Sequence, residues 1–271
     1  MNIDVSVIIC TFNRRNLVPR AIESVLSQED VKLQVVVVDD CSVDGTFEFL
    51  KEQYGHKVSI IKTLRNSGVS TSTNLGSRIA IGKFIALLGD DDYWEDRRKL
   101  AKQLNKMRKT PSLGLTGTWW TELRIDNQRL VKNPKLHKNR YLMIEKLLMG
   151  GGVVCGSTAL ISRRAWDSVN GMDERHVKGT DSDLFRRIAL AGYGVEVINE
   201  LTTIVDVSHG LMRMTPAENI SSLKRSLNAN TRVLKKHWLI YLIYPRALAM
   251  RVRKIVLLII KLLIKIIKQI I

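Results

Sequence analysis

Short apolar runs alternate with helically spaced apolar positions over the first hundred residues. Four runs of aliphatic or β-branched residues predict buried strands at 5–10, 35–38, 58–61 and 84–88. Apolar residues three or four positions apart predict helices between them, at 17–28, 46–54 and 70–80. Strands that are apolar on both faces and alternate with helices indicate an α/β fold, with a mostly parallel central sheet covered by helices on both sides.

The next hundred residues follow a less regular pattern. We expect helices at 97–109, 163–169 and 181–191. Strands are expected at 114–121 and 195–198, and a polar surface loop at 126–139. A chain of 271 residues accommodates one large domain with an appendage. We therefore predict one domain over residues 1–210, with halves at about 1–110 and 111–210, and a tail over 211–271.

Polar side chains stand at or near the end of each of the four predicted strands of the first half. They are Thr11, Asp39, Arg65 and the acidic stretch 90–92. The carboxyl ends of parallel strands share one edge of a sheet, and open α/β sheets bind ligands at that edge. Four polar strand ends in succession favour a nucleotide-type site.

The acidic stretch Asp90, Asp91 and Asp92 directly follows the apolar run 84–88. Three adjacent carboxylates repel one another, and a divalent cation with hard oxygen ligands, Mg²⁺ or Mn²⁺, would relieve the repulsion. The alternative is a solvated acidic turn that begins a helix near Trp94. The triplet by itself leaves both interpretations open.

The chain carries a formal charge of +17, and this charge is unevenly distributed. Residues 211–271 contain thirteen Lys or Arg and a single acid, Glu218, so +12 of the charge lies in the tail. A hydrophobic content of 45% is sufficient for a substantial core. The candidate site therefore lies in a nearly balanced body, and most of the basic charge lies in the tail.

The end of the tail has the pattern of an amphipathic helix. Four lysines fall within roughly 60° of one another at about 100° per residue: Lys254, Lys261, Lys265 and Lys268. Most other residues of 255–271 are Ile, Leu or Val, but the lysines interrupt them too often for a comfortable membrane span. We expect a helix in the membrane interface with its lysines toward anionic headgroups. The alternative is a helix packed on the body or on a partner subunit.

Two further features concern partners and location. The basic residues of the tail are interleaved with Ile and Leu rather than with stacking residues, which argues against nucleic acid as a partner. The three cysteines are widely spaced and form no CxxC, which fits a reducing compartment. No signal peptide precedes the first strand. We expect a peripheral protein on the cytoplasmic side of the inner (plasma) membrane.

Four segments together resemble the family 2 inverting glycosyltransferases, of the bacterial surface-polysaccharide type. They are VSVIICTFNR at 5–14, VVVDDCSVDGT at 36–46, RNSGVSTSTNLG at 65–76 and LLGDDDYW at 87–94. Their order and spacing also match, and the resemblance covers roughly residues 3–210. It implies the Rossmann-like GT-A fold, with a nucleotide-sugar donor half at about 1–110 and an acceptor half at about 111–210.

The resemblance implies a donor pocket at the ends of the first strands. Asp39 matches the family aspartate that accepts a hydrogen bond from the uracil or ribose of the donor. Thr11 and Asn13 would line the same pocket. Arg65 would supply a cation near the base or phosphates, and its alternative is a solvated loop arginine.

The acidic stretch corresponds to the family's DxD-type metal motif. Asp91 is the best match for a ligand of Mn²⁺ or Mg²⁺, and Asp90 would face the ribose or the metal. Asp92 is a second ligand candidate, and which of the two joins Asp91 is left open. Gly89 stands where the family often has the first Asp. His209 matches a position at which some relatives place a histidine near the metal.

The segment 179–187, GTDSDLFRR, resembles the element that carries the family's general base. The resemblance assigns this role to Asp181, because general-base catalysis needs a carboxylate within hydrogen-bond reach of the acceptor hydroxyl. Thr180 stands where the family usually has Glu. The alternative is that Asp181 only caps its helix.

The resemblance implies transfer of a sugar, with inversion, from a nucleotide-sugar to a lipid-linked glycan during cell-surface polysaccharide assembly. UDP is the expected nucleotide. A nucleotidyltransferase on a similar fold is one alternative, but the segment 11–14 lacks the glycine-rich phosphate loop that it would need. A catalytically inactive, membrane-bound scaffold is another, and it is kept open by Gly89 and Thr180.

Overall fold

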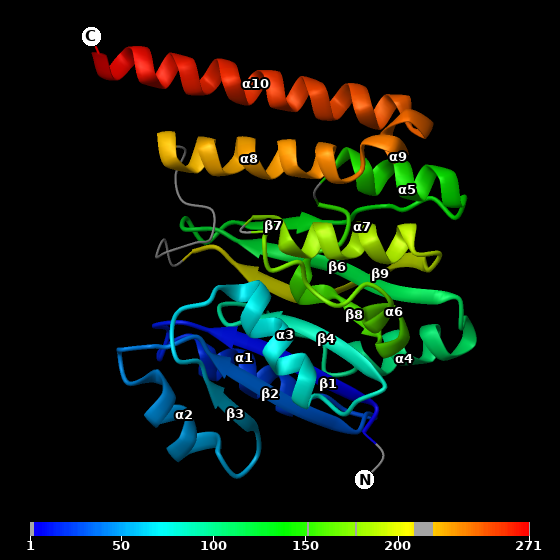
Figure 1. The fold of residues 1–271 in the computed structure, drawn as a ribbon. Coiled ribbons are helices and arrows are strands. Elements are labelled where there is room, and N and C mark those ends of the chain that lie inside the picture. The colour runs from blue at the N-terminus through cyan, green and yellow to red at the C-terminus, as the bar shows by residue number, and fades with distance from the viewer. Residues whose placement is uncertain (1–2, 151, 177, 209–218, 271) are drawn as a thin grey trace.

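The first half of the chain forms four parallel strands with helices between them (Figure 1). The computed structural model describes residues 3–150, 152–176, 178–208 and 219–270. The elements of the first half are β1 (Val5–Thr11), α1 (Val18–Leu26), β2 (Leu33–Asp39), α2 (Thr46–Tyr54), β3 (Ser59–Lys62), α3 (Val69–Ile79) and β4 (Phe84–Gly89). Each begins and ends within two residues of its predicted range.

The second half extends the same sheet with strands of mixed direction. Its elements are β5 (Tyr93–Trp94), α4 (Lys99–Lys109), β6 (Leu113–Leu123), β7 (Arg129–Lys132), α5 (Arg140–Met149), the 3₁₀ turn η1 (Gly156–Thr158), β8 (Leu160–Ser162), α6 (Arg163–Ser168), α7 (Thr180–Leu190) and β9 (Gly194–Asp206). The strand order among the described residues is β3-β2-β1-β4-β8-β6-β9-β5, with β7 beside β6. The α/β fold with a central sheet flanked by helices is confirmed; the sheet is parallel over its first four strands and mixed beyond them.

The sheet separates two hydrophobic cores. Side chains alternate along β1, so Val5, Val7 and Ile9 pack in one core with residues of α1 and α4, whereas Ile8 packs in the other with residues of α5 and α7. The helix α3 lies close against this second face, because a β-carbon at Gly76 would sit 2.8 Å from Ile8 Cγ2. Both faces of the strands are therefore covered, which accounts for their continuous apolar runs.

The strand register brings the polar strand ends together. Thr11 of β1 pairs with Asp39 of β2, and Asp39 pairs with Lys62 of β3. On the other side of β1, Cys10 pairs with Gly89, so the acidic stretch begins where β4 leaves the sheet. The four strand ends thus share one edge of the sheet, as the sequence pattern predicts.

Three local predictions differ from the structure. The residues around Trp94 form the short strand β5, paired with β9, and the helix begins only at Lys99. The predicted loop 126–139 contains β7, which pairs with β6. The predicted strand at 195–198 is part of the longer β9, whose register against β6 shifts near Trp119.

The tail forms a layer of three helices above the body (Figure 1): α8 (Ile220–Lys236), α9 (Trp238–Ile243) and α10 (Pro245–Ile270). Pro245 stands at the first position of α10, where its missing N–H costs nothing. Arg251 is 3% exposed and donates to the Leu148 carbonyl, to Asn230 Oδ1 (2.7 Å) and to the Tyr241 hydroxyl (3.0 Å). This arginine fastens α10 to α5, α8 and α9, and the expected helical tail is confirmed.

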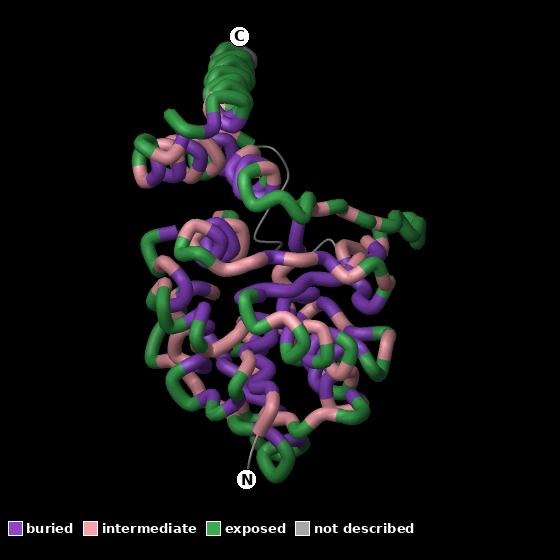
Figure 2. The backbone as a smooth tube through the Cα atoms, turned by 90° about the vertical axis from the view of Figure 1, so that its right-hand side faces the viewer, coloured by how far each residue is buried: buried purple, intermediate pink, exposed green. Residues whose placement is uncertain are grey.

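Beyond this anchor, α10 stands away from the body, and its positions there are largely exposed (Figure 2). Over the described residues, no helix combines the length and the apolarity needed to cross a bilayer.

Candidate functional site

Two buried polar atoms lie at the paired ends of β1 and β2. Thr11 is 2% exposed and Asp39 is fully buried. Neither Thr11 Oγ1 nor Asp39 Oδ1 has a hydrogen-bond partner among the described residues, and Asp39 Oδ2 accepts from the Ser42 amide at 3.2 Å. Burial raises the pKa of Asp39. Buried polar atoms are rarely left without partners, so this pair is suited to hydrogen bonds from a ligand.

The loops around this pair are fixed by their own hydrogen bonds. Asn13 has a left-handed backbone (φ 52°); its amide donates to Ser42 Oγ (2.8 Å), and its Oδ1 accepts from the Val43 amide (2.9 Å). Asp40 accepts from the amides of Ser67 (2.9 Å) and Gly68 (2.7 Å). Asp40 therefore shapes the loop that follows β3.

Arg65 lies on the loop shaped by Asp40, with its side chain exposed. Its carbonyl accepts from the hydroxyls of Thr63 and Ser67, and the Thr63 amide donates to the Asp39 carbonyl at 2.9 Å. Arg65 thus follows two residues after Thr63, whose amide bonds to the Asp39 backbone, and the Arg65 side chain is exposed.

Two carboxylates of the acidic stretch converge on one cation. Arg14 Nη1 lies 2.7 Å from Asp90 Oδ1 and 2.6 Å from Asp91 Oδ2. Burial raises the pKa of Asp90 to about 6, and the Arg14 guanidinium opposes that rise. Two carboxylate oxygens that converge on one point are also suitable ligands for Mg²⁺ or Mn²⁺. These residues therefore fit a divalent cation.

Asp92 has different partners. It is 7% exposed; Oδ2 accepts from the Ser157 hydroxyl and Oδ1 accepts from the Asp206 amide at 3.0 Å. Burial, followed by the charge of Asp91, raises its pKa to about 7. Both oxygens of Asp92 thus join the end of β4 to the second half of the chain.

Gly89 lies close to two carboxylates of the acidic stretch. A β-carbon built there would lie 2.9 Å from Asp91 Oδ1 and 3.0 Å from Asp92 Oδ2. A side chain at this position would force the two carboxylates to move. The glycine therefore matches the arrangement of the three aspartates that follow it.

Asp181 is half-buried in the first turn of α7. The N-cap of that helix is Gly179, which has a left-handed backbone and makes no side-chain cap. Asp181 Oδ1 accepts from the Ser182 amide at 2.6 Å, and the Gly156 amide and Arg186 also favour its charged form. Burial is the largest influence and raises the pKa of Asp181. The carboxylate thus faces the turn η1, which also contacts the acidic stretch.

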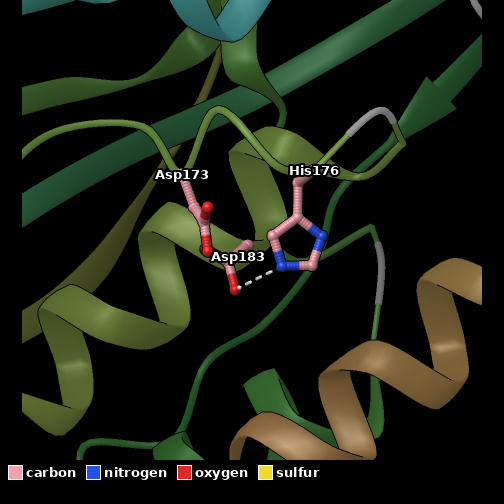
Figure 3. A group of neighbouring side chains, drawn as sticks. All are labelled: Asp173, His176 and Asp183. Carbon is pink, nitrogen blue, oxygen red and sulfur yellow. Dashed lines mark ion pairs between the residues drawn. The ribbon is translucent and has the colours of Figure 1, made fainter.

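A second group of possible metal ligands, Asp173, His176 and Asp183, is formed by the loop before α7 and the first turn of that helix (Figure 3). Lys236 Nζ is 2.8 Å from Asp173 Oδ2 and 3.2 Å from Asp183 Oδ2, and Arg187 Nε is 2.7 Å from Asp183 Oδ2. Although burial opposes ionisation, His176, His237 and Arg187 hold the pKa of Asp183 well below its usual range. The group is an ion-pair cluster that joins α7 to α8.

Sequence reasoning overlooked several residues that complete the site. Arg20 pairs with Asp206 (2.6 Å) and donates to the Asp91 carbonyl (2.8 Å). Arg14 lies within the segment 5–14 that carries the resemblance, but its partners are 76 and 77 residues away. The signal available in the sequence was the position of Arg14, three residues after the polar strand end at Thr11. His209 lies outside the described residues.

The comparisons with known proteins agree with this geometry. The family model described as Glycosyl transferase family 2 matches residues 6–169, more than half of the chain. The chain is 34% identical over 116 residues to a putative teichuronic acid biosynthesis glycosyltransferase, TuaG, of Bacillus subtilis, covering 42% of this chain and 46% of TuaG. It is 27% identical over 193 residues to chondroitin synthase of Escherichia coli, covering 69% of this chain and 27% of that protein. The chain therefore spans less than half the length of these relatives.

A third relative matches over most of its length. The putative colanic acid biosynthesis glycosyl transferase WcaA of Escherichia coli K12 is 25% identical over 217 residues, covering 78% of this chain and 75% of WcaA.

Solved structures share the fold. S. aureus TarS 1–349 in complex with UDP-GlcNAc gives a TM-score of 0.66 at 17% identity, covering 85% of this chain and 66% of TarS. The mannosyltransferase PcManGT from Pyrobaculum calidifontis, in complex with GDP-Man and Mn²⁺, gives a TM-score of 0.61 at 19% identity. The match covers 93% of this chain and 74% of PcManGT. The expected GT-A fold is confirmed. On its fold and on the match over residues 6–169, the chain belongs to glycosyl transferase family 2.

Proposed function

We propose that this chain is an inverting glycosyltransferase that moves a sugar from a UDP-linked donor to a lipid-linked glycan in bacterial surface-polysaccharide assembly. Family membership supports the reaction class. Relatives named for teichuronic acid and colanic acid biosynthesis support the pathway class. A relative named as a glucosyltransferase acting on a diphosphoundecaprenol-linked sugar supports a lipid-linked acceptor.

The observation that carries the proposal is the pair of unpartnered buried atoms, Thr11 Oγ1 and Asp39 Oδ1, beside the carboxylates that meet at Arg14. A carboxylate at Asp39 accepts from an imide N–H or a ribose hydroxyl. The loop containing Asn13, which is bonded to Ser42 and Val43, would line this pocket, and Arg65 would approach a bound nucleotide from the loop after β3. The UDP and UDP-GlcNAc complexes of TarS support uridine as the base.

A divalent cation, Mn²⁺ or Mg²⁺, is proposed beside the donor diphosphate, held by Asp91 together with Asp90. When bound, it would neutralise charge on the departing nucleoside diphosphate. Asp92 is the weaker candidate, because Ser157 and Asp206 already occupy both of its oxygens. His209 stays a predicted ligand. The Mn²⁺ in the PcManGT complex supports a metal-assisted reaction.

Asp181 is the proposed general base. Its carboxylate would take the proton of the acceptor hydroxyl as that oxygen attacks the anomeric carbon and the nucleoside diphosphate leaves. The displacement is single and inverts the configuration, so no covalent enzyme intermediate forms. Burial, which raises the pKa of Asp181, makes it a stronger base than a solvated aspartate.

The outward face of the tail is proposed to lie on an anionic membrane surface, on the cytoplasmic side. Large apolar side chains of α9 and α10 are 41% to 63% exposed: Trp238, Leu239, Leu242, Ile243, Met250, Val252, Val256, Leu257, Ile259, Ile260, Leu263, Ile264 and Ile267. Arg251 faces the body, so at about 100° per residue most of the α10 members point away from it.

The lysines of α10 support the same partner. Lys254, Lys261 and Lys265 lie along one edge, between the packed side of α10 and its apolar side, and Arg253 adds a cation within the apolar side. An apolar face bordered by cations is the pattern of helices that lie in the headgroup region of anionic membranes. A lipid-linked acceptor would be presented at that surface.

A donor screen tests the function. Thermal unfolding is followed with Mn²⁺ and, in turn, UDP-, GDP- and dTDP-sugars, for the wild-type chain and for Asp39→Ala. The proposal predicts stabilisation by UDP-sugars that Asp39→Ala removes. Stabilisation by none of them would contradict the donor pocket. Donor binding without transfer to any lipid-linked acceptor would favour the inactive scaffold. Formation of a nucleotide-sugar and pyrophosphate from a nucleoside triphosphate and a sugar 1-phosphate, in a separate assay, would favour a nucleotidyltransferase.

A further inference from the structure

The turn η1 contacts the acidic stretch on one side. Ser157 Oγ accepts from the Gly89 amide at 3.0 Å and donates to Asp92 Oδ2. The Ser157 carbonyl accepts from the Trp94 indole at 2.8 Å. Ser157 is 5% exposed, so these bonds are made away from water. One serine therefore holds residues before, within and after the three aspartates.

The same turn contacts Asp181 on its other side. The Gly156 amide faces the Asp181 carboxylate and favours its charged form. A β-carbon built at Gly156 would lie 3.5 Å from Asp181 Oδ2, which is an ordinary contact distance. Gly156 therefore contacts the proposed base, Asp181. The adjacent residue, Ser157, contacts the proposed metal and donor site.

A buried lysine at the start of α4 contacts the turn η1. Lys99 is fully buried; its Nζ lies 2.7 Å from Gln103 Oε1, 3.3 Å from the Thr158 carbonyl and 4.3 Å from the centre of the Trp94 ring. Gln103 donates to the same Thr158 carbonyl at 3.0 Å. Burying an ammonium group is costly unless its partners are fixed. Lys99 and Gln103 therefore hold the Thr158 carbonyl of η1 through two buried hydrogen bonds.

We propose that η1 is a positioning element that sets Asp91 and Asp181 relative to each other, with Ser157 as its principal positioning residue. Ser157 holds Asp92 and the Gly89 amide, which fixes the stretch that carries Asp91. Gly156 leaves room for Asp181 on the other side of the same turn. This inference rests on the proposed function, because it assigns the turn a role between that function's two reacting centres.

Two substitutions separate the two sides of the turn. Ser157→Ala removes the hydrogen bonds to Asp92 and Gly89, so Mn²⁺·UDP affinity and kcat are both expected to fall about tenfold. Ser157→Thr retains a hydroxyl and is expected to restore much of the affinity. Gly156→Val adds two γ-methyl groups beyond a β-carbon that would already be in contact with Asp181, so kcat is expected to fall about tenfold while Mn²⁺·UDP affinity stays at the wild-type value.

Ser77→Ala is the matched control, because Ser77 is also buried and, among the described residues, its hydroxyl bonds only to the Asn74 carbonyl of its own helix (2.8 Å). Affinity is measured by calorimetry, kcat by UDP release, and folding by thermal unfolding. A Ser157→Ala protein that unfolds at a lower temperature but keeps wild-type affinity and kcat would overturn the inference. So would a Gly156→Val protein that loses affinity as much as kcat. Absence of Mn²⁺·UDP binding in the wild-type chain would instead refute the proposed function.

Discussion

At the scale of single residues, the three adjacent aspartates have different environments. Asp90 and Asp91 share the cation of Arg14, whereas Asp92 is enclosed by bonds from Ser157 and Asp206. The sequence places all three at a strand end but does not distinguish them. The distinction depends on partners up to 114 residues away, which no local pattern reveals.

Substitution of each aspartate tests this division. Asp91→Asn is expected to weaken Mn²⁺ binding by more than about tenfold with little change in stability. Asp92→Asn is expected to lower the free energy of unfolding by about 1–3 kcal/mol, because it disturbs a buried hydrogen-bonded carboxylate, and to weaken Mn²⁺ binding less. Mn²⁺ titration and urea unfolding of both variants provide the measurement. The reverse order of effects would contradict the assignment.

The raised pKa values of Asp90 and Asp92 predict an unusual dependence of stability on pH. Their folded-state values, about 6 and about 7, lie above the ordinary value of 3.8. Between these limits the folded chain binds more protons than the unfolded chain, so stability falls as pH rises. We expect the metal-free protein to be less stable at about pH 6.5 than at about pH 5.

Urea unfolding at the two pH values, without divalent cations, measures this slope. The control is Asp90→Asn, in which the slope is expected to be smaller. Equal stability of the wild-type chain at both values, or a rise toward about pH 6.5, would contradict the buried state of the two carboxylates.

At the scale of elements, the sequence predicted the first half well, because apolar runs and helical spacing there coincide with buried strands and covering helices. The polar pair Asn199 and Glu200 interrupts the apolar pattern of β9, so the sequence suggested a shorter strand. The strand β7 is mostly exposed and has no core pattern to reveal it. Of the candidate site, the strand-end residues were predictable, whereas the contacts of the turn η1 with Asp92 and Asp181 were not, because they join residues far apart in the sequence.

The anchoring of α10 by Arg251 gives a prediction at the same scale. Arg251→Met removes three hydrogen bonds. Asn230 Oδ1 loses its arginine donor, and the Leu148 carbonyl keeps the bond from the Tyr241 hydroxyl. We expect a loss of about 3 kcal/mol of stability and faster proteolysis within α10. The control is Arg253→Met, on the exposed side of the same helix. Equal proteolysis of the two variants would show that Arg251 does not hold the helix.

At the scale of the whole molecule, the body carries the site and the tail carries an apolar surface bordered by lysines. Sedimentation with vesicles tests the proposed partner. The wild-type chain is expected to bind vesicles containing anionic phosphatidylglycerol and to bind neutral phosphatidylcholine vesicles much less. Leu263→Glu places a charge on the outward face and is expected to reduce binding about tenfold. Unchanged binding by this variant would point to another partner for α10.

The central claim is that one edge of the sheet binds a nucleotide-sugar and that Asp181 activates the acceptor. Its most direct test is transfer of labelled sugar, from the donor identified by the screen, into the lipid fraction of bacterial membranes. We expect wild-type transfer, no donor binding or transfer by Asp91→Asn, and normal donor binding with transfer reduced by at least about 100-fold in Asp181→Asn. Wild-type rates of transfer in Asp181→Asn would contradict the account.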